Sequence, residues 1–421
     1  MDNLLSIVKS TFNDVPENKA QTTIPIVDCL MSGLAIFSLK YPSLLQFERG
    51  MTEHATSHNL KTLFQIGKIP SDTYMRERLD DVSPKYLRKA FKKIFSVLQR
   101  GKHLEKFSYL DGHHLLSIDG TGHYRSSKIH CDSCCTKNHR TGKITYHHNM
   151  LAASIVHPGY KEVIPLAPEP ILKQDGKTKN DCEQNAAKRL LADTRREHPH
   201  LKLIVIEDAL HANSPHIELL KELNMRFIIG AKQYAKDFDY FEEEKILFHE
   251  EVDDNGTRHT FRFINDVSLN STNPNLKVNF LDYTNVSAKG KKQHFTWVTD
   301  MELTPSSVYK IMRGGRARWK IENETFNTLK NQGYHFEHNF GHGYKNLATI
   351  FANLMFLAFC IDQAQQIGCK LFRAILFETG SKCRLWEKIR ALFFQFLIGD
   401  WKTLYLAIER KHFMTLELDS T

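Results

Sequence analysis

Glu322 occupies a position in this sequence that suggests a functional role. Arg316 to Gly333 has the apolar spacing of a helix, with Glu322 at the centre of its apolar arc and Glu324 pointing the other way. The apolar members of the arc are Trp319, Thr325, Phe326 and Leu329. A glutamate in such a place costs free energy unless a positive charge meets it, so Arg318, one turn earlier, or a bound cation must face it. The pattern leaves a half-buried ion pair and a metal ligand both open.

Two aspartates at the ends of expected strands join Glu322 as candidates. Residues 114–122, HLLSIDGTG, read as a strand that delivers Asp119 just before a Gly-Thr-Gly turn. Residues 201–209, LKLIVIEDA, form a continuous apolar run typical of a strand buried on both faces. We favour Asp208 over Glu207 at its end, because strand alternation turns Glu207 to the opposite face. Three carboxylates are the hard oxygen ligands that hold two divalent ions about 3.5–4 Å apart for phosphodiester attack.

The elements that must position these residues alternate between strand and helix, which favours an α/β layer with parallel pairing and with Asp119 and Asp208 on adjacent strands. In the core, we predict strands at 114–122, 146–157, 201–209 and 226–231 and helices at 181–198 and 214–223. Later elements are strands at 257–264, 278–283 and 294–299 and helices at 346–367, 370–377 and 385–410. The predicted domains are helices at 1–105, a core at 106–234 and 301–345, a β-rich insertion at 235–300 and a helical C-terminal region at 346–421.

Basic residues suggest a surface for an anionic polymer. A short helix at 72–82 precedes a longer one at 84–100 whose charged side is basic, an arrangement that fits either a solvated face or phosphate contacts. Within the insertion, Lys291 and Lys292 form a basic cluster, which fits either contact with DNA or a solvated loop. The candidate DNA-binding residues are Arg76, Lys85, Arg88, Lys89, Lys92, Lys291, Lys292, Arg313, Arg316 and Lys330.

Composition narrows the class of protein. The 421 residues are 41% hydrophobic, which suits two or three globular domains and argues against disorder. The net charge of +9 fits an anionic partner. Residues 1–18 lack the pattern of a signal peptide, and the apolar stretch at 347–360 is shorter than a membrane span. Eight scattered cysteines do not resemble a disulfide framework, so we expect a cytoplasmic protein.

Cys131 and Cys134 have the spacing of half a zinc site. We consider His139 and Cys182 as the residues that complete a structural Zn²⁺ site, with free thiols in a hairpin as the alternative. The nearby histidines are interpreted as polar or phosphate-facing residues and not as ligands: His123, His130, His147 and His148.

Three motifs together resemble a known family. They are SIDGTG at 117–122, VIEDA at 205–209 and RWKIE at 318–322, and they resemble the DDE transposases of bacterial insertion sequences. In the most similar subgroup, a β-rich insertion precedes the last acidic residue, which lies in a Tyr-x2-Arg-x3-Glu-x6-Lys pattern. Arg318 and Glu322 match this pattern, but Gly315 stands at the tyrosine position. Leu329 stands at the lysine position, with Lys330 one residue late.

This resemblance implies a ribonuclease-H-like α/β fold: a mixed sheet with flanking helices, a β-rich insertion and a helical N-terminal domain. It implies that Asp119, Asp208 and Glu322 bind Mg²⁺ or Mn²⁺ and that Arg318 positions Glu322 or a phosphate. The implied partners are double-stranded DNA, as element ends and target, and a second copy of the chain on that DNA, in the nucleoid of a bacterial cytoplasm. Two other functions stay open: a catalytically inactive, transposase-derived DNA-binding protein and a metal-dependent nuclease without strand transfer.

Overall fold

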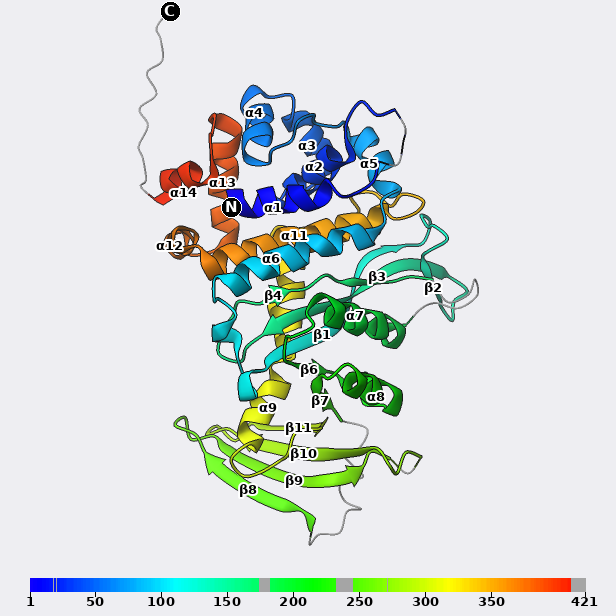
Figure 1. The fold of residues 1–421 in the computed structure, drawn as a ribbon, viewed down its shortest axis with the longest axis vertical. Coiled ribbons are helices and arrows are strands. Elements are labelled where there is room, and N and C mark those ends of the chain that lie inside the picture. The colour runs from blue at the N-terminus through cyan, green and yellow to red at the C-terminus, as the bar shows by residue number, and fades with distance from the viewer. Residues whose placement is uncertain (18, 20, 174–181, 232–244, 271, 410–421) are drawn as a thin grey trace, which may run out of the picture. The chain divides into compact units, whose positions relative to one another are not determined.

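The computed structural model describes residues 1–17, 19, 21–173, 182–231, 245–270 and 272–409 (Figure 1). The chain divides into two compact units. The first joins residues 1–103, 122–148 and 327–421, and the second joins 104–121 and 149–326. The predicted N-terminal and C-terminal helical regions therefore belong to one unit.

The first unit is mainly helical. Its N-terminal helices are α1 (Asp2–Phe12), α2 (Ile26–Ser38), α3 (Leu44–Gly50), α4 (His54–Leu63), α5 (Asp72–Asp80) and α6 (Arg88–Arg100), the last preceded by a 3₁₀ turn at Pro84–Leu87. Its C-terminal helices are α10 (Asn327–Asn331), α11 (Leu347–Gly368), α12 (Lys370–Thr379), α13 (Lys382–Gln395) and α14 (Trp401–Glu409). The single helix predicted over 385–410 is thus two helices, because residues 396–400 are not helical. Asp400 precedes α14 and accepts a hydrogen bond from the backbone N–H of Thr403 at 2.7 Å. Residues 410–421 lie outside the described part.

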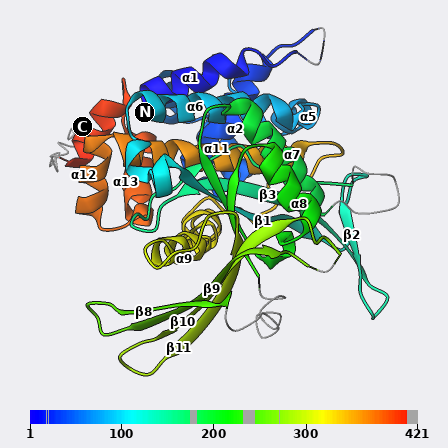
Figure 2. The same cartoon turned by 60° about the horizontal axis from the view of Figure 1, so that its bottom comes forward.

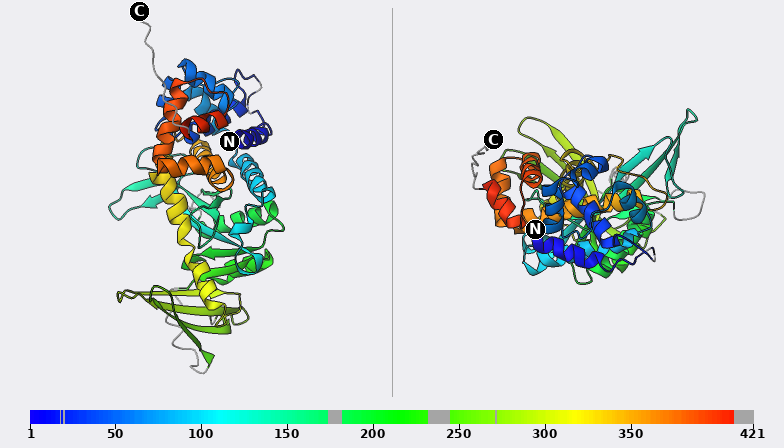
Figure 3. Two further views of the ribbon diagram at one scale, coloured as in Figure 1. Left: turned by 90° about the vertical axis from the view of Figure 1, so that its left-hand side faces the viewer. Right: turned by 90° about the horizontal axis from the view of Figure 1, so that it is seen from above.

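The core of this unit is built around α11. Among the helices that the structure describes, α11 is the one long and apolar enough to cross a membrane, and its most apolar window is wholly buried inside the protein. Gly33 of α2 lets the two helices approach closely, since a Cβ there would lie 2.8 Å from Leu354 Cδ1. The C-terminal helices gather beside the N-terminal ones (Figure 3), where Asn59 of α4 donates to the carbonyl oxygens of Phe393 and Phe396, at 2.7 Å each.

The second unit contains most of a large mixed sheet. Its strands are β1 (His114–Ser126), β3 (Ile144–Val156), β4 (Ile164–Pro165), β5 (Glu169–Ile171), β6 (Leu203–Glu207), β7 (Arg226–Gly230), β8 (Leu247–Val252), β9 (Arg258–Ser268), β10 (Lys277–Val286) and β11 (Lys292–Thr299). The strand order is β2-β3-β1-β6-β7-β11-β10-β9-β8, with β4 and β5 also paired to β3. The first residues of β3 and the last residues of β1 belong to the first unit, where β2 (Cys135–Asn138) pairs with β3. The predicted α/β fold with a mixed sheet is confirmed.

The parallel centre of the sheet follows from sequence. All five residues of β6 are buried, as its continuous apolar run predicts, and β6 pairs in parallel with both β1 and β7. Helices α7 (Glu183–Glu197) and α8 (Ser214–Glu222) form the crossovers. Asn213 caps α8 by accepting from the backbone N–H of His216, and a proline follows at the first turn. The predicted first residue of α7, Asp181, lies outside the described residues.

The β-rich insertion continues the same sheet. β11 pairs antiparallel with β7 and joins β10, β9 and β8 to it. Residues 235–244 of the predicted insertion lie outside the described part. Helix α9 (Val308–Arg316) follows, on the opposite side of the strands from α7 and α8 (Figures 2 and 3). The chain then passes through a turn of π-helix, Ile321–Phe326.

Candidate active site

Asp119 and Asp208 lie on neighbouring strands of the second unit. The parallel register pairs Ser117 of β1 with Ile206 of β6, so continuing it by two residues sets Asp119 level with Asp208. Adjacent strands run about 4.8 Å apart, which places both residues at the carboxyl end of the parallel pair. Asp119 is half-buried and Asp208 is exposed.

Strand alternation separates Asp208 from its acidic neighbour. Glu207 is 2% exposed, and its Oε2 lies 2.6 Å from His216 Nε2 of α8. Burial alone would raise the pKa of Glu207, but the charges of His216 and His211 and the bond to His216 lower it. Asp208 instead accepts a hydrogen bond at 3.0 Å from the backbone N–H of Leu210. Glu207 is therefore held within the fold, whereas Asp208 faces the groove described below.

Glu322 reaches the site from the π-helical turn. Its Oε1 lies 2.7 Å from Arg318 Nη2, while Arg318 Nη1 lies 2.9 Å from Asp119 Oδ2. The turn is tied to the sheet, because Ser117 of β1 donates to the carbonyl oxygen of Arg318 at 3.0 Å. Single π-helical turns inside regular helices are frequent at functional sites.

The expected burial of Glu322 is wrong. Its side chain is 49% exposed, and Trp319, expected on the same apolar face, is 45% exposed, whereas Thr325 and Leu329 are fully buried. The physical reason is the π-helix, whose i→i+5 hydrogen bonds widen the turn and rotate Glu322 away from the face that a regular wheel gives it. Glu322 therefore does not pay the free-energy cost of burial that made it a candidate in the sequence. It is assigned to the site because it contacts Arg318, which also contacts Asp119.

Arg318 balances the charge of the carboxylates. Burial raises the pKa of Asp119 to about 6; Arg318 and the N–H of Gly120 oppose this rise, and the charge and hydrogen bond of Glu322 add to it. Burial alone would lower the pKa of Arg318, but the bond to Glu322 and the charges of Asp119, Glu322 and Asp208 raise it. All three carboxylates therefore act on one guanidinium.

A fourth carboxylate, Glu183, was not identified from the sequence. It begins α7, and its pKa is raised by burial and by Asp208, while His211 acts in the opposite direction. Its carboxylate packs on the α-carbon of Gly120, where a Cβ would lie 2.4 Å from Glu183 Oε1. Nothing in local spacing links residue 183 to residue 119, so only the crossover helix brings them together.

A groove extends from this cluster. Its lining includes Asp208, Arg318, Arg316, Trp297 and the exposed Trp319, along with residues of β7 and β11. The guanidinium of Arg316 lies 4.9 Å from the ring centroid of Phe295, a cation–π contact that holds it at the groove. Trp297 is 5% exposed and stacks on Phe295.

Two departures from the Tyr-Arg-Glu-Lys-type pattern have a packing explanation. Gly315 lies where α9 crosses the sheet, and a Cβ there would meet Trp297 Nε1 at 2.6 Å and Ile228 Cγ2 at 3.0 Å. A tyrosine cannot fit at this position without moving the helix. Leu329 is fully buried, and Lys330, one residue later, forms a 2.8 Å ion pair with Glu337.

The candidate DNA-binding residues differ in how exposed they are and in whether they form ion pairs. Arg88 is 8% exposed, so its place on the basic face of α6 is wrong: it lies at the start of the helix, on the side packed into the fold. Arg76 pairs with Asp72, and Lys89 pairs with Asp14. The exposed members of the set are Lys85, Lys89, Lys92, Lys291, Lys292 and Arg313, whereas Arg76, Arg316 and Lys330 are half-buried.

Cys131 and Cys134 lie beside two histidines other than the one predicted. The ligand atoms of the two cysteines, His148 and His342 all lie within 4.8 Å of one another. His139 Nε2 instead contacts Thr145 Oγ1 at 3.0 Å, and Cys182 is exposed; neither is a member of this group. The interpretation of His148 as a polar or phosphate-facing residue is therefore also corrected, because its Nε2 faces both thiols.

The chain matches a known protein family. A sequence model of the family described as "Transposase DDE domain" matches residues 112–361, which is more than half of the chain. The matched region begins before β1 and ends within α11, so it includes Asp119, Asp208, Arg318 and Glu322. No curated protein is similar enough in sequence to match the chain.

Proposed function

Because this chain belongs to the family of transposase DDE domains, we propose that it is a DNA transposase that cuts at the ends of an insertion sequence and joins the freed 3′-hydroxyl to target DNA. The observation that carries the proposal is the convergence of Asp119, Asp208 and Glu322 on Arg318, at the carboxyl end of a parallel strand pair. The family match supports the class of enzyme, and the geometry of this cluster supports these residues as the ones that would perform its chemistry.

The donor set fits Mg²⁺ or Mn²⁺. Both ions prefer oxygen ligands, and Asp119, Asp208 and Glu322 offer carboxylate oxygens with no sulfur or imidazole among them. When bound, two such ions supply the Lewis acidity that activates a nucleophile and stabilises the leaving oxygen in phosphodiester attack. Arg318 holds Asp119 and Glu322 in place and keeps the net charge of the cluster low. Its guanidinium is also suited to contact a phosphate of the DNA.

The substrate in this proposal is double-stranded DNA. The groove beside Asp208 has Arg316 and Arg318 for phosphates and an exposed Trp319 that can stack on an unpaired base. Further exposed cations suited to phosphate contacts are Lys291, Lys292 and Arg313 in the second unit and, separately, Lys85 and Lys92 in the first. Cutting and joining two ends requires two active sites, so the working form in this proposal is a homodimer on DNA, in the nucleoid of a bacterial cytoplasm.

The test is cleavage and joining of the DNA that flanks the chain's own gene, with Mg²⁺ and with a chelator. Asp119→Asn, Asp208→Asn and Glu322→Gln should each abolish Mg²⁺-dependent cleavage while DNA binding persists, because each removes a charged ligand at nearly constant volume. Glu324→Gln is the matched control and should cleave normally, since Glu324 interacts with Lys320 and not with Arg318.

The products distinguish the other functions. Cleaved ends without joined products would replace the transposase with a nuclease, and specific binding without cleavage by the wild type would leave an inactive DNA-binding protein. Wild-type cleavage by any one of the three carboxylate variants would remove that residue from the site.

A further inference from the structure

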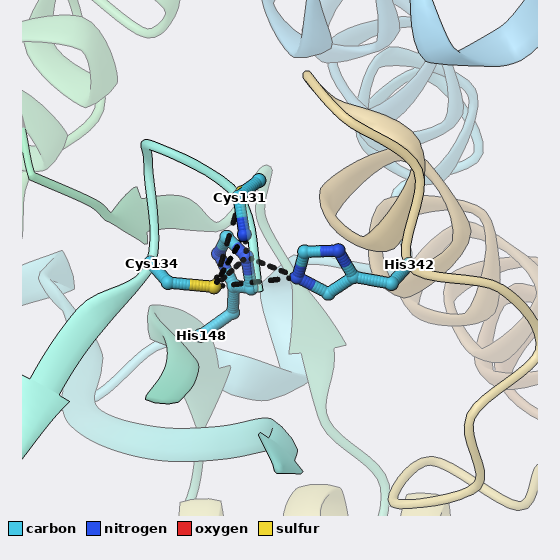
Figure 4. Close-up of side chains that lie close together, drawn as sticks. All are labelled: Cys131, Cys134, His148 and His342. Carbon is cyan, nitrogen blue, oxygen red and sulfur yellow. Dashed lines mark hydrogen bonds between the residues drawn. The ribbon is translucent and has the colours of Figure 1, made fainter. Parts of the chain in front are cut away.

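Four side chains of the first unit converge on one point, and none of them belongs to the carboxylate cluster. Cys131 and Cys134 come from the loop before β2, His148 comes from β3, and His342 comes from the segment between α10 and α11 (Figure 4). Cys134, His148 and His342 are buried, and Cys131 is half-buried.

We propose that these four residues bind one structural Zn²⁺ ion through two thiolates and two imidazole Nε2 atoms. A tetrahedral ion with bonds of about 2.3 Å to sulfur and about 2.0–2.1 Å to nitrogen sets its ligands about 3.8 Å (S to S), 3.5 Å (S to N) and 3.3 Å (N to N) apart.

The separations in the structure match this tetrahedron. The two sulfurs lie 3.8 Å apart, and the two Nε2 atoms lie 3.2 Å apart. The sulfur-to-nitrogen distances are 3.5 Å and 3.2 Å to His148 and 3.3 Å from Cys134 to His342. Two sulfurs and two imidazoles suit Zn²⁺ and exclude Mg²⁺ and Ca²⁺, which prefer oxygen.

The hydrogen-bonding state of His342 supports a ligand role. Its Nδ1 lies 2.8 Å from the carbonyl oxygen of Gly343, so Nδ1 carries the proton and donates, and the Nε2 lone pair faces the two thiols and His148. Cys131 and Cys134 do not form a disulfide, because their Sγ atoms lie 3.8 Å apart, far beyond the S–S bond length of about 2.05 Å.

The backbone around each ligand fixes its direction before an ion arrives. The β2–β3 register pairs Cys135 with His147, which brings the neighbouring Cys134 and His148 together. His342 is flanked by Gly341 and Gly343, both with positive φ (142° and 67°), and a Cβ at Gly343 would lie 2.3 Å from Asp80 Oδ1.

Asp80, at the end of α5, anchors this glycine-flanked segment. Its carboxylate accepts from the backbone N–H groups of Tyr344, Lys345, Asn346 and Leu347 at 2.8 to 3.0 Å. The ion would join two segments of one unit: the β2–β3 hairpin and the stretch that enters the core helix α11. Its role is therefore structural, because four protein ligands leave no open position for a substrate.

The first experiment is elemental analysis of the full chain purified without chelator. Wild type, His139→Gln and Cys182→Ser should each carry about one zinc per chain, whereas Cys134→Ser and His342→Ala should carry less than about a tenth. Wild type without zinc that also takes up none from added Zn²⁺ would overturn the proposal, as would full zinc content in both ligand variants or a Cys131–Cys134 disulfide found by mass spectrometry.

The second experiment separates loss of a ligand from loss of folding. Co²⁺ exchanged into the wild type should give the absorption bands of a tetrahedral ion with thiolate charge transfer. His342→Cys should keep about one equivalent and show stronger charge transfer, because a third thiolate then binds the ion. Octahedral bands in the wild type, or an unchanged spectrum in His342→Cys, would refute the assigned ligand set.

Discussion

Removal of Arg318 should move the pH dependence of catalysis. The guanidinium contacts Asp119 at 2.9 Å and Glu322 at 2.7 Å, and the pKa of Asp119 is already raised to about 6 by burial despite this contact. Arg318→Gln takes away the positive charge that favours ionised Asp119 and leaves Asp119 and Glu322 facing each other. Both changes raise the pKa of Asp119 further.

The size of the shift follows from the geometry. An adjacent arginine lowers the pKa of an aspartate by about 1–3 units, and the low end applies here because both side chains are about a quarter exposed. The pKa should therefore rise from about 6 to about 7, which corresponds to about 1.4 kcal/mol. Asp119 must be ionised to hold a divalent ion, so activity is lost as the pH falls through this pKa. The acidic limb of the profile should move up by about one pH unit.

The assay is Mg²⁺-dependent cleavage from pH 5 to 9, with the midpoint of the acidic limb as the readout. Loss of a phosphate contact by Arg318→Gln would lower the amplitude of cleavage but leave the midpoint in place. Arg316→Gln is the control: its guanidinium contacts Phe295 and Gln293, so its midpoint should match the wild type. A midpoint that stays in place in Arg318→Gln, or one that moves equally in Arg316→Gln, would refute the assigned role of Arg318.

Two further predictions concern packing. Gly315→Ala should lower the midpoint of thermal unfolding, because about 1–3 kcal/mol of overpacking against Trp297 exceeds the gain of about 1 kcal/mol in helix propensity. Gly399→Ala is the control and should change the midpoint little, because the space around Gly399 is open. An unchanged midpoint in Gly315→Ala would contradict the close approach of α9 to Trp297. Lys40→Met should cost about 3–5 kcal/mol in urea unfolding, because it removes the fully buried cation that lies 2.8 Å from Asp362. Replacing both residues by apolar ones should recover only part of the loss, because the buried Tyr334 hydroxyl then loses Asp362 as its acceptor. A near-neutral single variant would count against this ion pair.

Much of the sheet was predictable because its signals are local. The run at 201–209 reads as a doubly buried strand, and all residues of β6 are buried. Alternation along that strand predicts opposite directions for Glu207 and Asp208. In the structure the buried Glu207 contacts His216 of α8, whereas Asp208 is exposed. The signals for helix ends are equally local, as in α8, where Asn213 and a following proline mark the first turn.

The residues that sequence reasoning missed are joined only by the fold. Glu183 reaches Gly120 from the start of a crossover helix, and His342 reaches Cys134 from the segment before α11, so neither has a spacing that could reveal it. The π-helical turn at Glu322 was missed for another reason. A helical wheel assumes i→i+4 bonds, and no residue at 316–326 marks the change, whereas Ser117 of β1 bonds the carbonyl oxygen of Arg318 from outside the helix.

The two departures from the family pattern bear on whether the site is active. The carboxylates and Arg318 are in place, and the substituted positions are Gly315, which lies against Trp297, and Leu329, which is fully buried. Gly315 lets α9 lie close to Trp297, and α9 leads directly to the turn that carries Arg318 and Glu322. A tyrosine would push this helix away from the sheet and take the turn with it. The glycine thus supports the carboxylate cluster, which favours a working nuclease site over an inactive DNA-binding remnant.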